Sequence, residues 1–234
     1  MKVGVIQSNY VPWRGYFDFV DEVDLFIFHD DLQYTKGDWR NRNKIKTPKG
    51  LIWLTVPVNY EQTSQWICDT RIDYSQKWRE GHLHRFQANY VKTPFFMEAM
   101  SLFEEGLSCG DSTISQLNIR LIKLISGYLG ITTPLALSSE YAVTGTKTDR
   151  LIQLLRKVGA TSYLSGPRAK GYLDENLFRD HGIGLEYKSY DYPAYPQPWG
   201  KFAGMVSMLD LIANTGRTAR DYLKSQTPNT VAMG

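Results

Sequence analysis

The sequence lacks the features that mark secreted and membrane proteins. Its 234 residues include only two cysteines, Cys68 and Cys109, which follow no zinc-binding spacing and are too few for a disulfide framework. No apolar run approaches the roughly 18 residues that a membrane-spanning helix needs. The first residues have the pattern of a strand with one lysine, which is unlike a signal peptide. We therefore expect a cytoplasmic protein without membrane insertion.

A large excess of one charge is also missing. The 27 Lys and Arg residues stand against 24 Asp and Glu residues, and the net charge of +3 is too small to favour nucleic acid by electrostatics. RNA binding through residues 34–46 is therefore a weak hypothesis. The sequence contains no P-loop and no G-x-G-x-x-G, and the loop at Ser165 does not have the G-x-S-x-G form of an α/β-hydrolase, which disfavours these standard sites.

Short apolar runs alternate with segments of helical periodicity. The runs Val3–Ile6 and Leu25–Phe28 are typical of buried strands, and Pro12 opens a helix between them. Further strands are predicted at residues 133–137, 161–164 and 183–187, and further helices at 147–158, 205–212 and 217–223. This alternation predicts an α/β fold with a mostly parallel, doubly wound, Rossmann-like sheet.

Two additions to the sheet are expected within a single domain of residues 1–234. A β-turn signature at residues 47–50 predicts an inserted hairpin, which would either extend the sheet or cap the site. Residues 75–130 have the periodicity of a helical block, in which Asp111-Ser112 is expected to cap the clearest helix. The C-terminal residues 225–234 are expected to fray.

Polar residues follow the predicted strands. In open α/β sheets the ligand lies outside the carboxyl ends of the strands, which singles out the loops at residues 7–13, 29–42 and 165–168. Asp30 and Asp31 are the catalytic candidates, because such carboxylates can act as a general base, orient an amine or hold Mg²⁺. On extended backbone their side chains point to opposite sides, so we expect one to face the site. The alternative is that one caps a turn and the other pairs with a cation, and His29 is either a base or a packed residue.

Amide, aromatic and cationic side chains supply the candidate binding residues. Arginine forks suit phosphate or carboxylate, and aromatic faces suit sugar rings or bases, which favours a small phosphorylated ligand over a solvated charged hairpin. The predicted substrate-binding residues are Gln7, Asn9, Tyr10, Trp13, Tyr16, Gln33, Tyr34, Trp39, Asn41, Arg42, Lys44, Ser165, Gly166, Tyr195 and Gln197. No metal ligands are assigned, and the cofactor is not identified beyond a possible nucleotide with Mg²⁺.

Several blocks of sequence together carry a family resemblance. They are Gln7–Trp13 with Gly15-Tyr16-Phe17, Asp30–Tyr34, Trp39 with Asn41–Lys46, Tyr163–Gly166, Tyr192–Gln197, and Ser207–Leu211 with Asn214 and Gly216. On these blocks the chain resembles the WbqC-like proteins, a bacterial family encountered in O-antigen and other surface-polysaccharide gene clusters. The first strand and helix also look distantly like nucleotidylyl transferases, but Tyr16 stands where those enzymes carry histidine.

The resemblance implies a transferase of surface-polysaccharide biosynthesis. Such an enzyme would move an acyl or aminoacyl group, glycine being one candidate, to an amino sugar or nucleotide-linked sugar, and its partner would be that small molecule. An ATP-dependent ligase that forms an acyl-adenylate and a non-catalytic nucleotide-sugar binding protein are the alternatives. The family brings no settled catalytic residue, so the roles of Asp30 and Asp31 rest on their position in the sequence.

Overall fold

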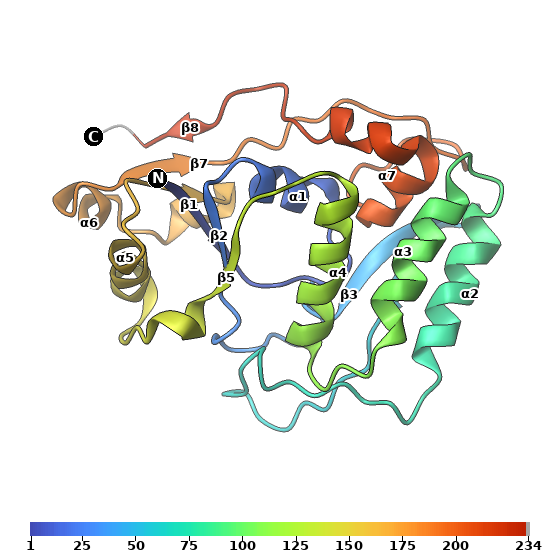
Figure 1. The fold of residues 1–234 in the computed structure, drawn as a ribbon, viewed down its shortest axis with the longest axis horizontal. Helices are drawn as coiled ribbons and strands as arrows, with labels where there is room; N and C mark the ends of the chain where they lie inside the picture. The colour runs from blue at the N-terminus through green and yellow to red at the C-terminus, as the bar shows by residue number, and fades with distance from the viewer. Residues whose placement is uncertain (233–234) are drawn as a thin grey trace.

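Six strands form one sheet in the computed structural model, which describes residues 1–232 (Figure 1). The strands are β1 (Lys2–Ile6), β2 (Leu25–Phe28), β5 (Leu135–Leu137), β6 (Ser162–Ser165), β7 (Gly184–Tyr187) and β8 (Thr230–Val231). Their order is β5-β2-β1-β6-β7-β8, and every neighbouring pair is parallel except β7 and β8. The prediction of an α/β fold with a mostly parallel, Rossmann-like sheet is confirmed.

The strand order determines where a ligand crevice can form. The chain passes from β1 through α1 (Arg14–Asp21) to β2, and β5 later joins the sheet beyond β2. It then returns through α5 (Lys147–Lys157) to the other side of β1, where β6 and β7 follow. The direction of winding therefore reverses between β1 and β6, and ligands bind at the carboxyl ends of strands beside such a switch point.

The two faces of the sheet bury different side chains, because successive strand residues point to opposite sides. Phe26 and Phe28 belong to a large core shared with α1 and the helices of residues 78–128. Ile27, between them, belongs to a second core with α5 and α6 (Glu175–Asp180). Helices therefore cover both faces, as expected for a doubly wound sheet.

The predicted helical block lies at the side of the molecule away from α5 and α6 (Figure 1). It contains α2 (Trp78–Tyr90), α3 (Phe96–Ser108) and α4 (Ile114–Tyr128), and α7 (Met208–Thr215) packs against α3. The expected cap at Asp111-Ser112 is wrong, because Thr113 and Gln116 form a reciprocal capping box at the start of α4. Gly106 permits close packing of α3 on α4, since a Cβ there would lie 2.2 Å from Leu121 Cδ2.

Short 3-10 helices and one terminal strand depart from the predictions. The 3-10 helices are η1 (Ser138–Tyr141), η2 (Pro167–Gly171) and η3 (Gly216–Tyr222). The last of these replaces the α-helix expected at residues 217–223. The expected fraying at residues 225–234 is wrong for β8, because Thr230 and Val231 pair with Tyr187 and Glu186. Residues 233–234, which the same prediction included, lie outside the described residues.

The inserted hairpin forms a two-stranded sheet of its own, so it does not extend the main sheet. Its strands are β3 (Arg42–Thr47) and β4 (Gly50–Thr55). Asn43 Nδ2 donates to the carbonyl oxygens of Tyr10 and Val11 at 3.2 and 2.8 Å. The Lys46 N–H donates to the Tyr90 hydroxyl at 2.8 Å. The hairpin therefore joins the loop after β1 to the helical block.

Candidate functional site

A cavity of about 470 Å³ opens where β1, β2 and β6 end and α5 begins. Its lining residues are Val5, Ile6, Gln7, His29, Leu32, Lys147, Thr148, Arg150, Leu151, Tyr163, Tyr172 and Leu173. Apolar walls with a few polar groups and a volume of this size are typical of small-molecule sites. The position is the one that the strand order indicates, beside the switch point between β1 and β6.

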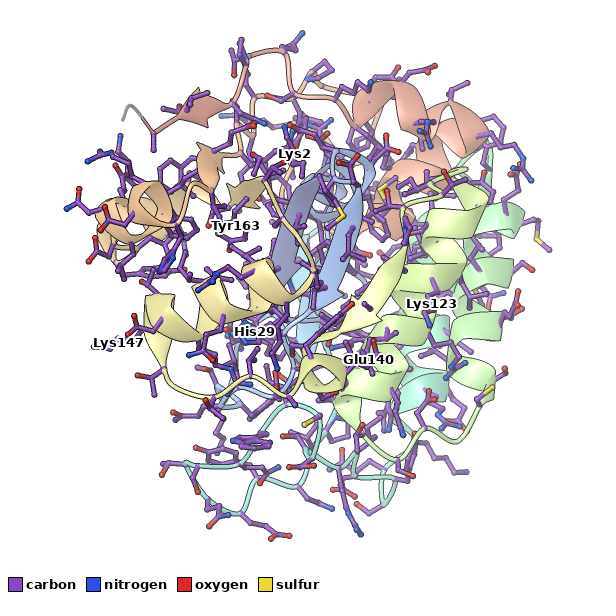
Figure 2. The ribbon with its side chains drawn as sticks, turned by 60° about the vertical axis from the view of Figure 1, so that its left-hand side comes forward. Lys2, His29, Lys123, Glu140, Lys147 and Tyr163 are labelled. Atoms are coloured by element: carbon purple, nitrogen blue, oxygen red, sulfur yellow. The ribbon has the colours of Figure 1, made fainter. Side chains whose placement is uncertain are left out.

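The first turn of α5 lines this cavity and presents positive charge to it. Thr146, at the N-cap, makes no side-chain hydrogen bond to the helix, which leaves first-turn N–H groups open to a ligand. Lys147 and Arg150 belong to the lining, and Lys147 is labelled at the N-terminal end of α5 in Figure 2. Lys147 has φ 52°, in the left-handed region that side chains disfavour, and such strain concentrates at functional sites. This end of the cavity suits an anion.

His29 contributes an uncharged imidazole to the same cavity (Figure 2). Burial lowers the pKa of His29 to about 4, although the nearby Asp31 charge acts in the opposite direction. Its Nε2 lies 3.9 Å from Asp31 Oδ1 and has no hydrogen-bond partner among the described residues. At neutral pH the ring is therefore uncharged and able to accept a proton or a hydrogen bond.

The two candidate carboxylates point to different parts of the molecule. Asp31 accepts hydrogen bonds from Arg150 Nη2 and Ser138 Oγ, so it ties α5 and η1 to the end of β2. Asp30 is buried on the other side, where it accepts from the Ser8 N–H at 2.7 Å and from Ser115 Oγ at 2.5 Å. Asp31 thus supports the cavity wall through Arg150, and Asp30 joins the first loop to α4. A catalytic role for either one stays a prediction.

The loop after β1 is tightly organised, and Gln7 is its member that lines the cavity. The backbone carbonyl of Gln7 accepts from the Tyr16 hydroxyl at 3.2 Å, and Asn9 Oδ1 accepts from Arg40. Tyr10 is fully buried, and its hydroxyl bonds to His82 Nδ1 at 2.8 Å. Tyr10 and Tyr16 therefore lie in the core rather than in the cavity lining.

Gly15 leaves room for the Trp13 indole at the start of α1. A Cβ on Gly15 would lie 2.4 Å from the Trp13 ring, so the glycine at the start of α1 permits the indole to lie across the helix. The other edges of that indole meet Tyr190 and Tyr192 at centroid distances of 5.2 and 5.7 Å. Trp13 is thus part of an aromatic cluster outside the cavity lining.

A second group of predicted residues gathers on the hairpin, where they contact one another. The Arg42 guanidinium carbon lies 4.2 Å from the centroid of the Trp53 ring, and Lys44 Nζ lies 4.7 Å from it. The Trp39 ring packs on Trp53 at a centroid distance of 5.3 Å. Asn41 is buried and donates to the Val56 carbonyl at 2.8 Å. These residues form an aromatic and cationic surface separate from the cavity. Trp53, its centre, was not among the predicted residues.

Tyr195 and Gln197 belong to a buried network around Asp210, a fully buried residue of α7. The Tyr195 hydroxyl donates to Asp210 Oδ1 at 2.7 Å, and Gln197 Nε2 donates to the same oxygen at 2.6 Å. The Tyr90 hydroxyl donates to Asp210 Oδ2 at 2.5 Å. Asn214, one helical turn further along α7, donates to the Asp210 carbonyl at 2.7 Å.

The remaining predicted residues lie at the end of β6, in the core or, for Gln33, at the surface. Ser165 ends β6 and is buried, and Gly166 leads from it into η2. Tyr34 is 1% exposed and packs on Tyr60 at a centroid distance of 5.7 Å. Gln33 is exposed and forms an isolated backbone bridge with Trp66. Substrate binding by these residues stays a prediction.

Most of the residues that line the cavity were not among the site residues predicted from the sequence. Lys147, Thr148 and Arg150 belong to a helix that begins ten residues after β5 ends, so no predicted strand end pointed to them. Tyr163 lies inside β6, and Tyr172 lies beyond η2. The strand order brings them together. The sequence signal that could have pointed to them was the glycine-containing turn at residues 144–146 directly before a helix that starts with Lys147.

Other classes of site receive no support from the described residues. Across residues 1–232, no three His, Cys, Asp or Glu side chains gather in a way that could hold a metal ion. None of the helices formed by these residues combines the length and apolar character that crossing a bilayer requires.

The fold is that of an α/β protein of the Rossmann-like class with a cavity at its switch point. Comparison with known proteins places the chain more narrowly: it belongs to the WbqC-like protein family, which matches residues 7–222. It is 46% identical over 226 residues to the uncharacterized protein Rv1507c of Mycobacterium tuberculosis (strain ATCC 25618 / H37Rv), covering 95% of this chain and 97% of that protein. No solved structure matches the chain.

Proposed function

We propose that this protein is a cytoplasmic transferase of surface-polysaccharide biosynthesis. It would bind a nucleotide-linked amino sugar in the switch-point cavity and transfer an acyl or aminoacyl group to the sugar amine. The observation that carries the proposal is the cavity of about 470 Å³ whose lining includes Lys147 and Arg150 from the first turn of α5. Membership of the WbqC-like family supports the polysaccharide context.

The phosphate of the ligand would bind at the start of α5. Open N–H groups in a first turn, together with the helix dipole, favour an anion there. Lys147 adds a mobile charge, and Arg150 adds a guanidinium that Asp31 holds in place. Gln7 lies across the cavity at the end of β1, where its amide can bond a sugar hydroxyl.

His29 is the base that the geometry offers for acyl transfer to an amine. When the amine attacks the acyl carbonyl, the new C–N bond forms as the amine loses a proton and the donor leaving group departs. The Asp31 carboxylate lies 3.9 Å from His29 Nε2, and its charge raises the pKa of the ring against the effect of burial. The same carboxylate would stabilise the imidazolium that forms.

The binding step is tested with a matched pair of lysine variants. Calorimetric titration with UDP-, TDP- and GDP-linked sugars should identify a ligand for the wild-type chain. Lys147→Gln should weaken its binding at least tenfold, because the charge at the rim is lost. Lys123→Gln, on the exposed face of α4, should bind as the wild type does. Equal binding by both variants would show that the ligand phosphate does not bind at the start of α5.

The chemical step separates a transferase from its two alternatives. Mass spectrometry of the bound sugar, after incubation with acyl-CoA or with glycine and ATP, should show a mass gain for the wild type. His29→Gln should keep the ligand and lose the product, whereas Asp31→Asn should lose the product and also weaken binding, because Arg150 loses its carboxylate partner. Product formation with acyl-CoA alone supports the transferase, whereas amino-acid-dependent pyrophosphate exchange indicates the ATP-dependent ligase. Binding without product under every condition indicates the non-catalytic binding protein.

A further inference from the structure

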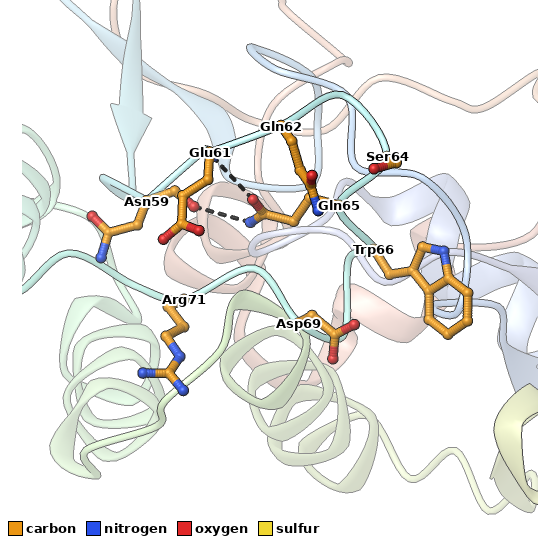
Figure 3. A pocket seen from close by; sticks show the side chains of 8 residues that line it. All are labelled: Asn59, Glu61, Gln62, Ser64, Gln65, Trp66, Asp69 and Arg71. Atoms are coloured by element: carbon orange, nitrogen blue, oxygen red, sulfur yellow. Dashed lines mark hydrogen bonds between the residues drawn. The ribbon is translucent and has the colours of Figure 1, made fainter.

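A second hollow lies on the loop of residues 59–71, outside the switch-point cavity. Its volume is about 560 Å³. Its lining residues are Asn59, Glu61, Gln62, Ser64, Gln65, Trp66, Asp69 and Arg71 (Figure 3). In that view Gln62 and Gln65 lie along one side, Asp69 and Arg71 along the other, and the Trp66 indole at one end. Nothing in the proposed acyl transfer uses this hollow.

The loop is held firmly against the segment that follows β2. The Tyr34 N–H donates to the Gln65 carbonyl at 2.8 Å, and the Ile67 N–H donates to the Leu32 carbonyl at 2.9 Å. The Cys68 N–H donates to the Asp30 carbonyl at 2.9 Å. Ile67 is fully buried and anchors the loop in the core. The hollow is therefore a formed feature that adjoins the chain between His29 and Tyr34.

Trp66 is the exposed aromatic of this hollow. Its exposed fraction is 49%, whereas the next residue, Ile67, is 0% exposed. The Trp66 carbonyl accepts from Thr70 Oγ1 at 2.7 Å, and its backbone pairs with Gln33, so the position of the residue is fixed without its indole. Tryptophan is enriched at binding interfaces, because its ring is apolar while its N–H can bond to a polar group.

The other groups that line the hollow favour an uncharged ligand with many hydroxyl groups. Four of them carry amides or a hydroxyl, and the charged ones are Glu61, Asp69 and Arg71. Two carboxylates against one guanidinium disfavour phosphate groups, which argues against nucleotides and against RNA. Planar amide, carboxylate and guanidinium groups instead suit pairs of neighbouring hydroxyls, and an indole face suits the C–H face of a sugar ring.

We propose that this hollow is a carbohydrate subsite that holds a neutral sugar unit against Trp66. Asp69 and Arg71 would bond its hydroxyls from one side and the Gln62 amide from the other. The Gln65 amide instead braces the loop, because it bonds to the Asn59 carbonyl, the Thr70 hydroxyl and the Glu61 N–H. This sugar unit is distinct from the nucleotide-linked amino sugar that the proposed function places in the switch-point cavity. Binding of a neutral sugar does not depend on that function.

The test compares two exposed tryptophans. Wild-type protein and its variants are applied to a printed array of neutral bacterial and synthetic oligosaccharides, and the strongest hit is titrated by calorimetry. Trp66→Ala should weaken that binding at least tenfold, and Trp66→Tyr should restore most of it, because a stacking ring returns. Trp199→Ala removes an indole that is 41% exposed on another loop and should bind as the wild type does. Unchanged urea unfolding of Trp66→Ala confirms that the loop is intact.

Three results would overturn the proposal. They are the absence of any neutral oligosaccharide bound by the wild-type chain, equal binding by the Trp66→Ala variant, and binding of single-stranded RNA in place of sugar at Trp66. Lys147→Gln separates this proposal from the proposed function, because it should leave oligosaccharide binding intact while weakening the nucleotide-linked sugar. Trp66→Ala should do the reverse.

Discussion

His82 is a buried histidine whose protonation should destabilise the fold. Its side chain lies between the hairpin and the loop after β1, with 2% exposure. Its Nε2 lies 3.2 Å from the Thr55 carbonyl, and its Nδ1 lies 2.8 Å from the Tyr10 hydroxyl. Because a carbonyl only accepts, Nε2 carries the ring proton, and Nδ1 accepts from Tyr10. A second proton on Nδ1 would break that bond and place a charge in the core.

The size of the effect follows from the pKa. Burial lowers the pKa of His82 from 6.5 to about 4. The unfolded chain therefore takes up a proton below pH 6.5 that the folded chain does not, so stability is full above that pH and falls as the pH drops toward 4. Between pH 6.5 and pH 5 the loss runs at about 1.36 kcal/mol per unit and reaches about 2 kcal/mol.

Urea unfolding at pH 7 and pH 5 measures this loss. In His82→Gln, whose amide can both donate and accept, the fall in unfolding free energy between the two pH values should be about 2 kcal/mol smaller than in the wild type. His84→Gln, at an exposed position on the same helix, should fall as the wild type does. An equally large fall in His82→Gln would refute the assigned tautomer and the cost of charging this ring.

Two further predictions concern packing and the buried network, and urea unfolding measures both. Gly106→Ala should destabilise the protein by about 1–3 kcal/mol, because its Cβ would meet Leu121 at 2.2 Å. Gly127→Ala, where no atom lies within 4 Å of the added Cβ, should be neutral or stabilising by up to about 1 kcal/mol. Asp210→Asn should destabilise by about 1–3 kcal/mol, because an amide nitrogen cannot accept from the tyrosine hydroxyls that donate to the carboxylate. A stability unchanged in Gly106→Ala or Asp210→Asn would contradict the packing or the network, respectively.

The order of the strands within the sheet could not be predicted from the sequence. Local pattern was enough for β1 and β2, since each apolar run is bounded by polar residues, and it placed Gln7 and His29 at strand ends. It also predicted α5. It did not reveal that α5 starts beside β1, because that follows from the crossover between β5 and β6 over the intervening strands. Lys147 and Arg150 became site residues only through that crossover.

The predicted binding tyrosines Tyr10 and Tyr195 lie in the core for a different reason. A tyrosine beside polar residues suits a wet cavity and a hydrogen-bonded core equally well. Tyr10 bonds to His82, which lies 72 residues away in the chain, and Tyr195 bonds to Asp210. These partners depend on tertiary packing, so no local pattern could have separated the core tyrosines from Tyr172, which is 74% exposed at the cavity.

Hydrogen–deuterium exchange with a bound nucleotide-linked sugar tests the location of the site most directly. The sugar that binds most tightly in the calorimetric screen is added at saturation, and exchange is compared with the free protein. We predict slower exchange at residues 147–151, at the end of β1 and at residues 163–173, which together surround the switch-point cavity. Slower exchange confined to the hairpin of residues 42–55, with no change at the start of α5, would contradict the assignment of this cavity as the ligand site.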